Sequence, residues 1–155
     1  LDAGTGIRRL SHAVGPEVRR IHLLLTHLHS DHTTDVNDVI TTRWVQSFAP
    51  MPLTVVGPEG TTRWIDRTME VLQDDIGYRL AHHEDLTWQP ENLVTDVRDG
   101  VALDLEGVRV VAAPTSAGLT EFCTAVIRIC ITSPSPAPST NMKNARLQAV
   151  VVPIT

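Results

Sequence analysis

The chain has 155 residues, 42% of them hydrophobic, and a formal net charge of −5 at pH 7. This length suits one domain with a hydrophobic core and is short for two. No apolar run reaches the ~20 residues of a membrane span and no secretion signal is present, so we expect a cytoplasmic protein without a membrane partner. The acidic balance gives no electrostatic footprint for RNA. A local basic rim could still come from Arg8-Arg9, Arg19-Arg20 and Arg43, although solvated faces explain these arginines more simply.

The first part of the chain predicts a helix, a strand and a second helix. A short helix is expected over residues 5–14, with Thr5 as its N-cap, before a buried apolar strand at 21–25. Apolar residues then recur at helical spacing from Val36 to Phe48. This second helix would begin directly after a polar segment, residues 26–32.

A second buried strand is expected at 53–56, followed by a helix whose inner face runs from residue 64 to 76. Trp64 lies on that face and is expected in the core. An irregular polar stretch follows the helix and carries His82 and His83. This pair could face a cleft, but such pairs are more often simply exposed.

The later part of the chain changes to a period of two. Residues 101–105 and 108–113 predict a hairpin around Gly107. Two further strands are expected by propensity at 126–132 and 149–154, on either side of a loosely held linker rich in Pro and Ser. These patterns alone support only a mixed α and β fold.

The segment Thr26-His27-Leu28-His29-Ser30-Asp31-His32 is the part of the chain richest in chemistry. Three imidazoles and a carboxylate within six residues form a donor set suited to zinc, iron or manganese. Since residues i and i+2 of an extended segment point to one side, His27 and His29 could share an ion. A turn into a helix would move Asp31 and His32 to a neighbouring position, where a second ion ~3.5–4 Å away becomes feasible. The alternative is a polar loop with coincidental histidines.

This motif resembles the metallo-β-lactamase fold superfamily, and within it the ribonuclease Z-like and arylsulfatase-like branch. The resemblance includes Leu1-Asp2-Ala3-Gly4-Thr5-Gly6 before the motif and Thr33-Thr34-Asp35 after it. It covers about residues 1–115 and implies an α/β fold, an αββα sandwich that is incomplete here, at about its N-terminal half. Residues 116–155 would then be a divergent tail, rich in Pro and Ser at 133–140.

The resemblance implies a metal-dependent hydrolase of phosphodiester or related ester bonds, in which a metal-activated water attacks the substrate. Zinc would be the metal, with two ions in the family, and manganese or iron as alternatives. His27 and His29 would bind the first ion, Asp31 and His32 the second, and Asp31 would also accept a proton. Asp2 would orient a ligand or the loop, although a turn-forming aspartate is an equally good interpretation. The family also implies a tRNA precursor as a substrate and a homodimer.

The sequence departs from the family pattern after residue 115. The family's third histidine belongs to an Asp-His pair at this place, where the chain has Ser116-Ala117. No histidine follows His83, and no acidic residue follows Glu121. The chain could be a diverged protein, but a tail read from a shifted frame explains the change in composition better.

These missing ligands leave alternatives open. The chain could be a non-catalytic fragment or a binding module with a partial metal site, and His82 or His83 could substitute for a lost ligand if their segment folds over the site. An intact relative could also act on a sulfate ester or a small phosphodiester.

Overall fold

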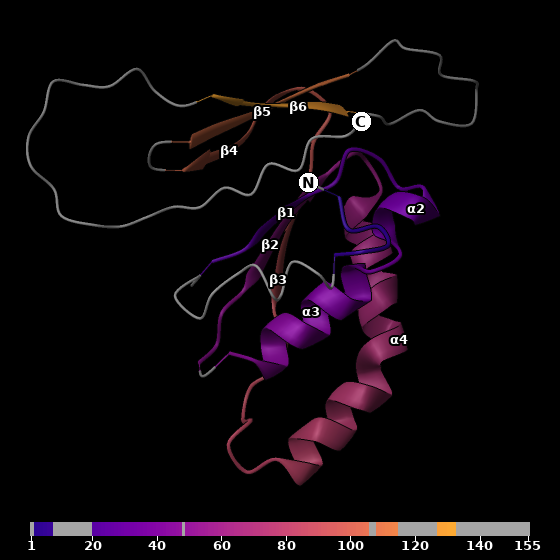
Figure 1. The fold of residues 1–155 in the computed structure, drawn as a ribbon, viewed down its shortest axis with the longest axis vertical. Helices are drawn as coiled ribbons and strands as arrows, with labels where there is room; N and C mark the ends of the chain where they lie inside the picture. Colours follow the sequence, from indigo (N-terminus) through magenta and orange to yellow (C-terminus); the bar gives the residue numbers. More distant parts are fainter. Residues whose placement is uncertain (1, 8–19, 48, 106–107, 115–126, 133–155) are drawn as a thin grey trace, which may run out of the picture.

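The computed structural model describes residues 2–7, 20–47, 49–105 and 108–114, and the backbone of a strand at 127–132 (Figure 1). The predicted helix over 5–14 lies largely outside these residues, and the expected strand at 149–154 lies wholly outside them. Within the described part, no helix is long and apolar enough to cross a membrane.

The first sheet contains three parallel strands, with β2 in the middle. They are β1 (His22–Leu24), β2 (Leu53–Gly57) and β3 (Asn92–Asp96). The predicted strands at 21–25 and 53–56 are therefore confirmed. The sequence pattern does not predict β3, because this strand is mostly exposed and is held by backbone pairing with β2, from Leu53↔Asn92 to Gly57↔Asp96.

Helices cover one face of this sheet (Figure 1). A single helical turn, α2 (Ser30–Thr33), leads into α3 (Val36–Val45), and β2 is followed by α4 (Thr61–His82). Alternate residues of β1 and β2, such as Leu23 and Val55, pack against Ile40 of α3 and Ile65 of α4. This alternation reflects strand geometry, in which successive side chains point to opposite faces.

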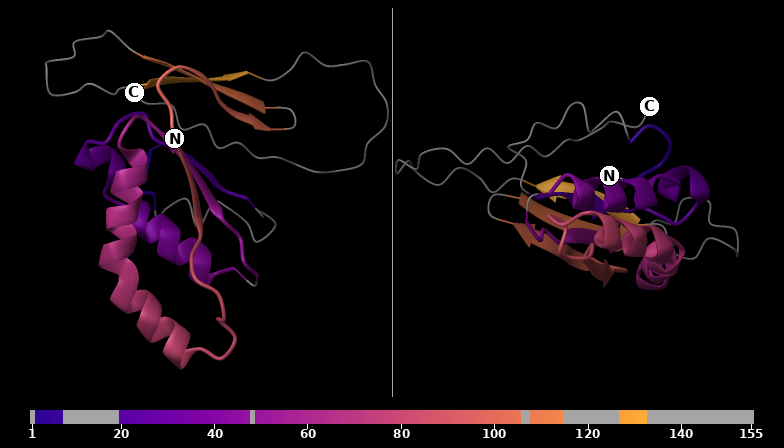
Figure 2. Two further views of the ribbon diagram at one scale, coloured as in Figure 1. Left: turned by 180° about the vertical axis from the view of Figure 1, so that it is seen from behind. Right: turned by 90° about the horizontal axis from the view of Figure 1, so that it is seen from below.

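The other face of the first sheet packs against a second, antiparallel sheet. Its strands are β4 (Gly100–Leu105), β5 (Val108–Pro114) and β6 (Ile127–Thr132). Leu24 and Val56 meet Val110 between the sheets, and Figure 2 shows the two sheets from other sides. The predicted hairpin and the strand expected at 126–132 are confirmed. Helices, sheet and sheet make three layers of an αββα sandwich among the described residues.

The end of α4 corrects one expectation from the sequence. The polar stretch from Tyr78 was expected to be irregular, but α4 continues to His82. An ion pair between Arg79 and Asp75 at i,i+4 (2.8 Å) supports this last part. The single Gly77 is not enough to end a helix of this length.

Candidate metal centre

The histidine motif lies at the carboxyl end of β1, where the sheet pairing stops. Leu25 N–H still donates to Val56 O (2.7 Å), after which the chain leaves the sheet. His29 is extended, with φ −66° and ψ 148°, and α2 begins at Ser30. The carboxyl ends of parallel strands are common places for ligand sites in α/β sheets.

Three of the four predicted ligands come together in a cluster suited to a metal ion. Ligand atoms of His27, Asp31 and His32 all lie within 4.8 Å of one another. His32 Nε2 is 3.4 Å from Asp31 Oδ2, and the rings of His27 and His32 have centroids 3.9 Å apart. Ligands at ~2.0–2.2 Å from a tetrahedral ion would be about 3.5 Å apart, so small side-chain rotations suffice to close the cluster.

The fourth predicted ligand, His29, stands beside this cluster. Its ring packs edge-on against His27, with centroids 4.8 Å apart. The donor group comprises His27, Asp31 and His32 without His29. The expected division into a His27/His29 pair and an Asp31/His32 pair therefore stays a prediction, because His27 lies with the second pair in this structure.

Asp2 connects the imidazoles from behind the cluster. Its carboxylate accepts hydrogen bonds from Thr26 N–H (2.7 Å) and from the Thr26 hydroxyl (2.9 and 3.0 Å). The same carboxylate contacts His32 Nδ1 at 2.9 Å, and Thr26 Oγ1 lies 3.0 Å from His27 Nδ1. One side chain thus contacts His32 directly and His27 through a hydroxyl group.

This network fixes which nitrogen of each imidazole carries the proton. An ionised carboxylate only accepts hydrogen bonds, so Nδ1 of His32 must donate to Asp2. The Thr26 hydroxyl group donates its single proton to Asp2, so its oxygen must accept a hydrogen bond from Nδ1–H of His27. When the rings are neutral, Nε2 is then the unprotonated nitrogen, through which an imidazole can bind a metal.

Backbone pairing on both sides holds Asp2 in this position. Asp2 N–H donates to Leu24 O and Ala3 N–H to His32 O, each at 2.8 Å, so the segment is tied to both β1 and α2. Asp2 has a φ of +39°, which Asp and Asn tolerate better than most residues. Ala3 is fully buried, and a side chain on Gly4 would collide with the Asp31 carbonyl group. The small residues after Asp2 therefore allow the close approach.

Electrostatics favour the neutral form of the central imidazole. Burial lowers the pKa of His27, and the neighbouring His32 and His29 lower it further, while Asp2 and Asp31 act in the opposite direction. A neutral ring is the form that a metal ion requires.

His82 and His83 do not reach the cluster; they form the exposed pair that the sequence favoured, and the alternative that they face its cleft is wrong. They lie at the end of α4 opposite Thr61, and 21 residues of helix at ~1.5 Å each separate the two ends by about 30 Å. His82 Nδ1 contacts Tyr78 O at 2.8 Å, and both histidines are exposed. The helical continuation of α4 carries them away from the site.

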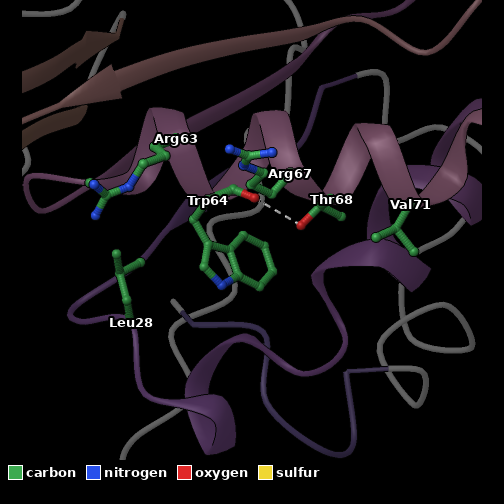
Figure 3. Close-up of a pocket in the computed structure, with 7 residues that line it drawn as sticks. Leu28, Arg63, Trp64, Arg67, Thr68 and Val71 are labelled. Atoms are coloured by element: carbon green, nitrogen blue, oxygen red, sulfur yellow. Dashed lines mark hydrogen bonds between the residues drawn. The ribbon is translucent and has the colours of Figure 1, made fainter.

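An open groove of about 380 Å³ lies beside the motif on the N-terminal half of α4, and we call it the α4 groove (Figure 3). It is lined by Leu28, Gly60, Arg63, Trp64, Arg67, Thr68 and Val71. Trp64 was expected in the core and does pack against it in part, but its ring also lines this groove. This groove was not predicted from the sequence. The signal for it in the sequence is the spacing of Arg63 and Arg67, which lie one helical turn apart.

The basic rim considered from the sequence is not formed at the site by the described arginines. Arg43 instead approaches Met51 Sδ at 3.2 Å, in a separate hollow beside Trp44. Arg20 is exposed before β1, and Arg8, Arg9 and Arg19 lie outside the described residues.

Comparison with curated proteins finds relatives that match 74% of the chain. Ribonuclease Z of Mycolicibacterium gilvum is 45% identical over 118 residues, which cover 74% of this chain and 41% of the relative. Ribonuclease Z of Mycobacterium avium is also 45% identical over 118 residues, covering 74% and 42%. These relatives support the assignment of the matched residues to the ribonuclease Z-like branch of the metallo-β-lactamase superfamily. The chain spans less than half the length of these curated relatives, and no family model matches it.

Solved structures agree on the fold. The short form of human tRNase Z superposes with a TM-score of 0.57 at 20% identity, covering 85% of this chain and 51% of that one. A diphosphatase of the PhnP family gives a TM-score of 0.50 at 16% identity, covering 84% and 43%. At these identities the likeness concerns the fold, and it confirms the metallo-β-lactamase fold expected from the sequence.

Proposed function

We propose that this chain is part of a metal-dependent phosphodiester hydrolase of the ribonuclease Z type, acting on RNA such as a tRNA precursor. The observation that carries the proposal is the cluster of His27, Asp31 and His32, in which Asp2 contacts Nδ1 of His32 directly and Nδ1 of His27 through Thr26. The ribonuclease Z names of the relatives at 45% identity support the same chemistry.

The donor set fits a divalent ion, and zinc is the ion we propose, with manganese or iron as alternatives. His27, Asp31 and His32 would hold it, and His29 stands close enough to join by rotation. When bound, such an ion acidifies water and offsets negative charge on a phosphodiester. Asp31 is the most exposed member of the cluster, with 77% of its side chain accessible. This position at the mouth of the site suits a group that accepts a proton from water.

A non-catalytic role is the second candidate, because of Ser116-Ala117. A catalytic zinc normally has three protein ligands and an open position, and a two-metal site needs more protein ligands than a single zinc does. The motif alone offers four donors for two ions, and the chain has no histidine after His83. A remnant with a partial metal site would bind an ion without turnover.

The coding sequence around codons 114–120 separates the two candidates most simply. An Asp-His pair in another frame would show that the parent protein carries the missing ligands. The protein with that downstream half restored should then hydrolyse bis(p-nitrophenyl) phosphate in the presence of zinc or manganese. Absence of turnover would favour the remnant, and turnover of p-nitrophenyl sulfate alone would favour the sulfate-ester alternative.

Metal content tests the ligands independently of turnover. His27→Ala or Asp31→Ala should remove most of the metal bound by the chain, because each deletes one donor of a small set. Plasma emission after equilibrium dialysis against zinc measures the content, with His82→Ala as the matched control. Unchanged content in the first two variants would contradict the proposed ligands. A homodimer remains a prediction from the family resemblance, and a cytoplasmic location remains a prediction from the sequence.

A further inference from the structure

We propose that the α4 groove binds the single-stranded part of an RNA substrate next to the scissile bond. A nucleobase would pack on Trp64 and Leu28, and neighbouring phosphates would meet Arg63 and Arg67. This inference rests on the proposed function and specifies where the substrate strand runs.

The groove adjoins the histidine motif at Leu28. This residue separates His27 from His29 in the chain and also lines the groove. On the opposite wall, Gly60 precedes α4, and a Cβ added there would lie only 3.5 Å from Leu28 Cδ1. A strand lying in the groove would therefore extend along α4 from the ligand loop.

The chemistry of the lining suits nucleotides. The lining is mainly apolar, with the ring of Trp64 and the 83% exposed Val71, and Arg63 and Arg67 carry positive charge beside it (Figure 3). Among the described residues, no carboxylate lines the groove, whereas Asp66, Glu70 and Asp74 line a different hollow on α4. Aromatic stacking combined with cationic side chains is the usual way in which proteins bind single-stranded nucleic acid without reading its sequence.

Both arginines are available to a phosphate. Within the described ranges, Arg63 has no recorded ion pair or side-chain hydrogen bond. Arg67 pairs with Glu70 at 2.8 Å, but the two side chains are 73% and 61% exposed. Such exposed pairs contribute little, so exchange of the Glu70 carboxylate for a phosphate costs little.

The amino end of α4 does not compete for the phosphate, because Asp96 already occupies it. Its carboxylate accepts from Gly60 N–H (2.8 Å), Thr62 N–H (2.7 Å) and the Thr62 hydroxyl (2.7 Å). Any anion in the groove must therefore be met by the guanidinium groups. The groove volume lies within the ~300–1,000 Å³ typical of ligand sites.

Binding of a labelled, unstructured RNA of about 12 nucleotides, a length within known single-strand site sizes, tests the proposal by anisotropy. The full chain is measured in EDTA, so that neither cleavage nor metal contributes. Arg63→Gln/Arg67→Gln should weaken binding roughly tenfold at low salt and reduce the salt slope by about 1.4, since each lost phosphate contact removes ~0.7. Arg79→Gln is the matched control: Arg79 also lies on α4 and pairs with a helix neighbour, Asp75, but is outside the groove.

Tryptophan emission supplies a second readout. RNA should quench the wild-type protein and quench Trp64→Phe much less, because Trp44 is buried and Trp88 lies elsewhere. Wild-type affinity in the double arginine variant, an equal loss in Arg79→Gln, or full quenching in Trp64→Phe would each overturn the proposal. The double arginine variant should keep the metal content of the wild type after dialysis against zinc, whereas His27→Ala should lose it. Failure of the metal site and failure of the groove are therefore distinguishable.

Discussion

Replacing Asp2 by asparagine tests how far one carboxylate controls the metal centre. Asparagine keeps the shape and tolerates the φ of +39°. Its oxygen can still accept from Thr26 N–H, but its amide group must donate to His32 Nδ1, which shifts the imidazole proton to Nε2. That nitrogen faces Asp31 at 3.4 Å and would no longer have a lone pair for an ion.

The expected loss in zinc affinity for Asp2→Asn is about 10–100-fold, the usual cost of removing the partner that orients a metal-binding histidine. This corresponds to about 1.4–2.7 kcal/mol. Asp2→Ala should also lower the free energy of unfolding, by about 2–5 kcal/mol. About 1–3 kcal/mol comes from leaving Thr26 N–H without an acceptor, and about 1–2 kcal/mol from an alanine at positive φ.

Zinc competition with a chelating dye measures the affinity, and urea unfolding in EDTA measures the stability of the metal-free chain. Asp35→Asn is the matched control, since Asp35 follows the same motif and its carboxylate accepts from Gly6 N–H (3.2 Å). Nitrogen-15 spectra of the imidazoles report the tautomer directly. Wild-type zinc affinity in Asp2→Asn, or a His32 ring that still carries its proton on Nδ1, would refute the reasoning.

Three further changes test other parts of the structure. Gly4→Ala should weaken zinc binding without removing a ligand, because the added methyl group pushes the Asp31 backbone away. Zinc titration measures this affinity, and an affinity equal to that of the wild type would contradict the prediction. Asp96→Ala should cost about 1 kcal/mol in urea unfolding as a lost helix cap. Burial raises the pKa of Asp96, but hydrogen bonds from the start of α4 outweigh this effect and lower the pKa. The ionised form therefore stabilises the fold above pH ~4. The difference in unfolding free energy between variant and wild type should vanish as the pH falls through the folded pKa. The chain as it stands should bind zinc more weakly than about micromolar, on the order of −8 kcal/mol. His82→Ala/His83→Ala should leave the zinc affinity measured by calorimetric titration unchanged. Loss of zinc binding in this variant would show that these histidines are ligands.

The sequence predicts those elements whose pattern is local. The apolar run before His27, the helical spacing after Val36 and the alternation around Gly107 each reflect neighbours within a few residues, and all three elements form as expected. By contrast, β3 depends on a partner strand about 40 residues earlier, and its exposed Leu93 gives little apolar signal.

The proposed ligands show the same difference between local patterns, which the sequence predicts, and long-range contacts, which it does not. The density of His and Asp identifies the motif from the sequence alone, whereas the grouping of His27 with Asp31 and His32 requires the turn at α2. The link from Asp2 to two imidazoles, and the cap that Asp96 places on α4, join residues 24 to 36 positions apart. Spacing in the sequence carries no information about such contacts.

The ligands His27, Asp31 and His32 lie within six consecutive residues, and this placement bears on how the centre could arise. Closing so short a loop costs little chain entropy, so the donors meet with few long-range contacts in place. Such a centre depends less on the order in which distant strands assemble than one gathered from several strands. A seven-residue segment of this kind, with one aspartate behind it, is a unit small enough to be moved between scaffolds.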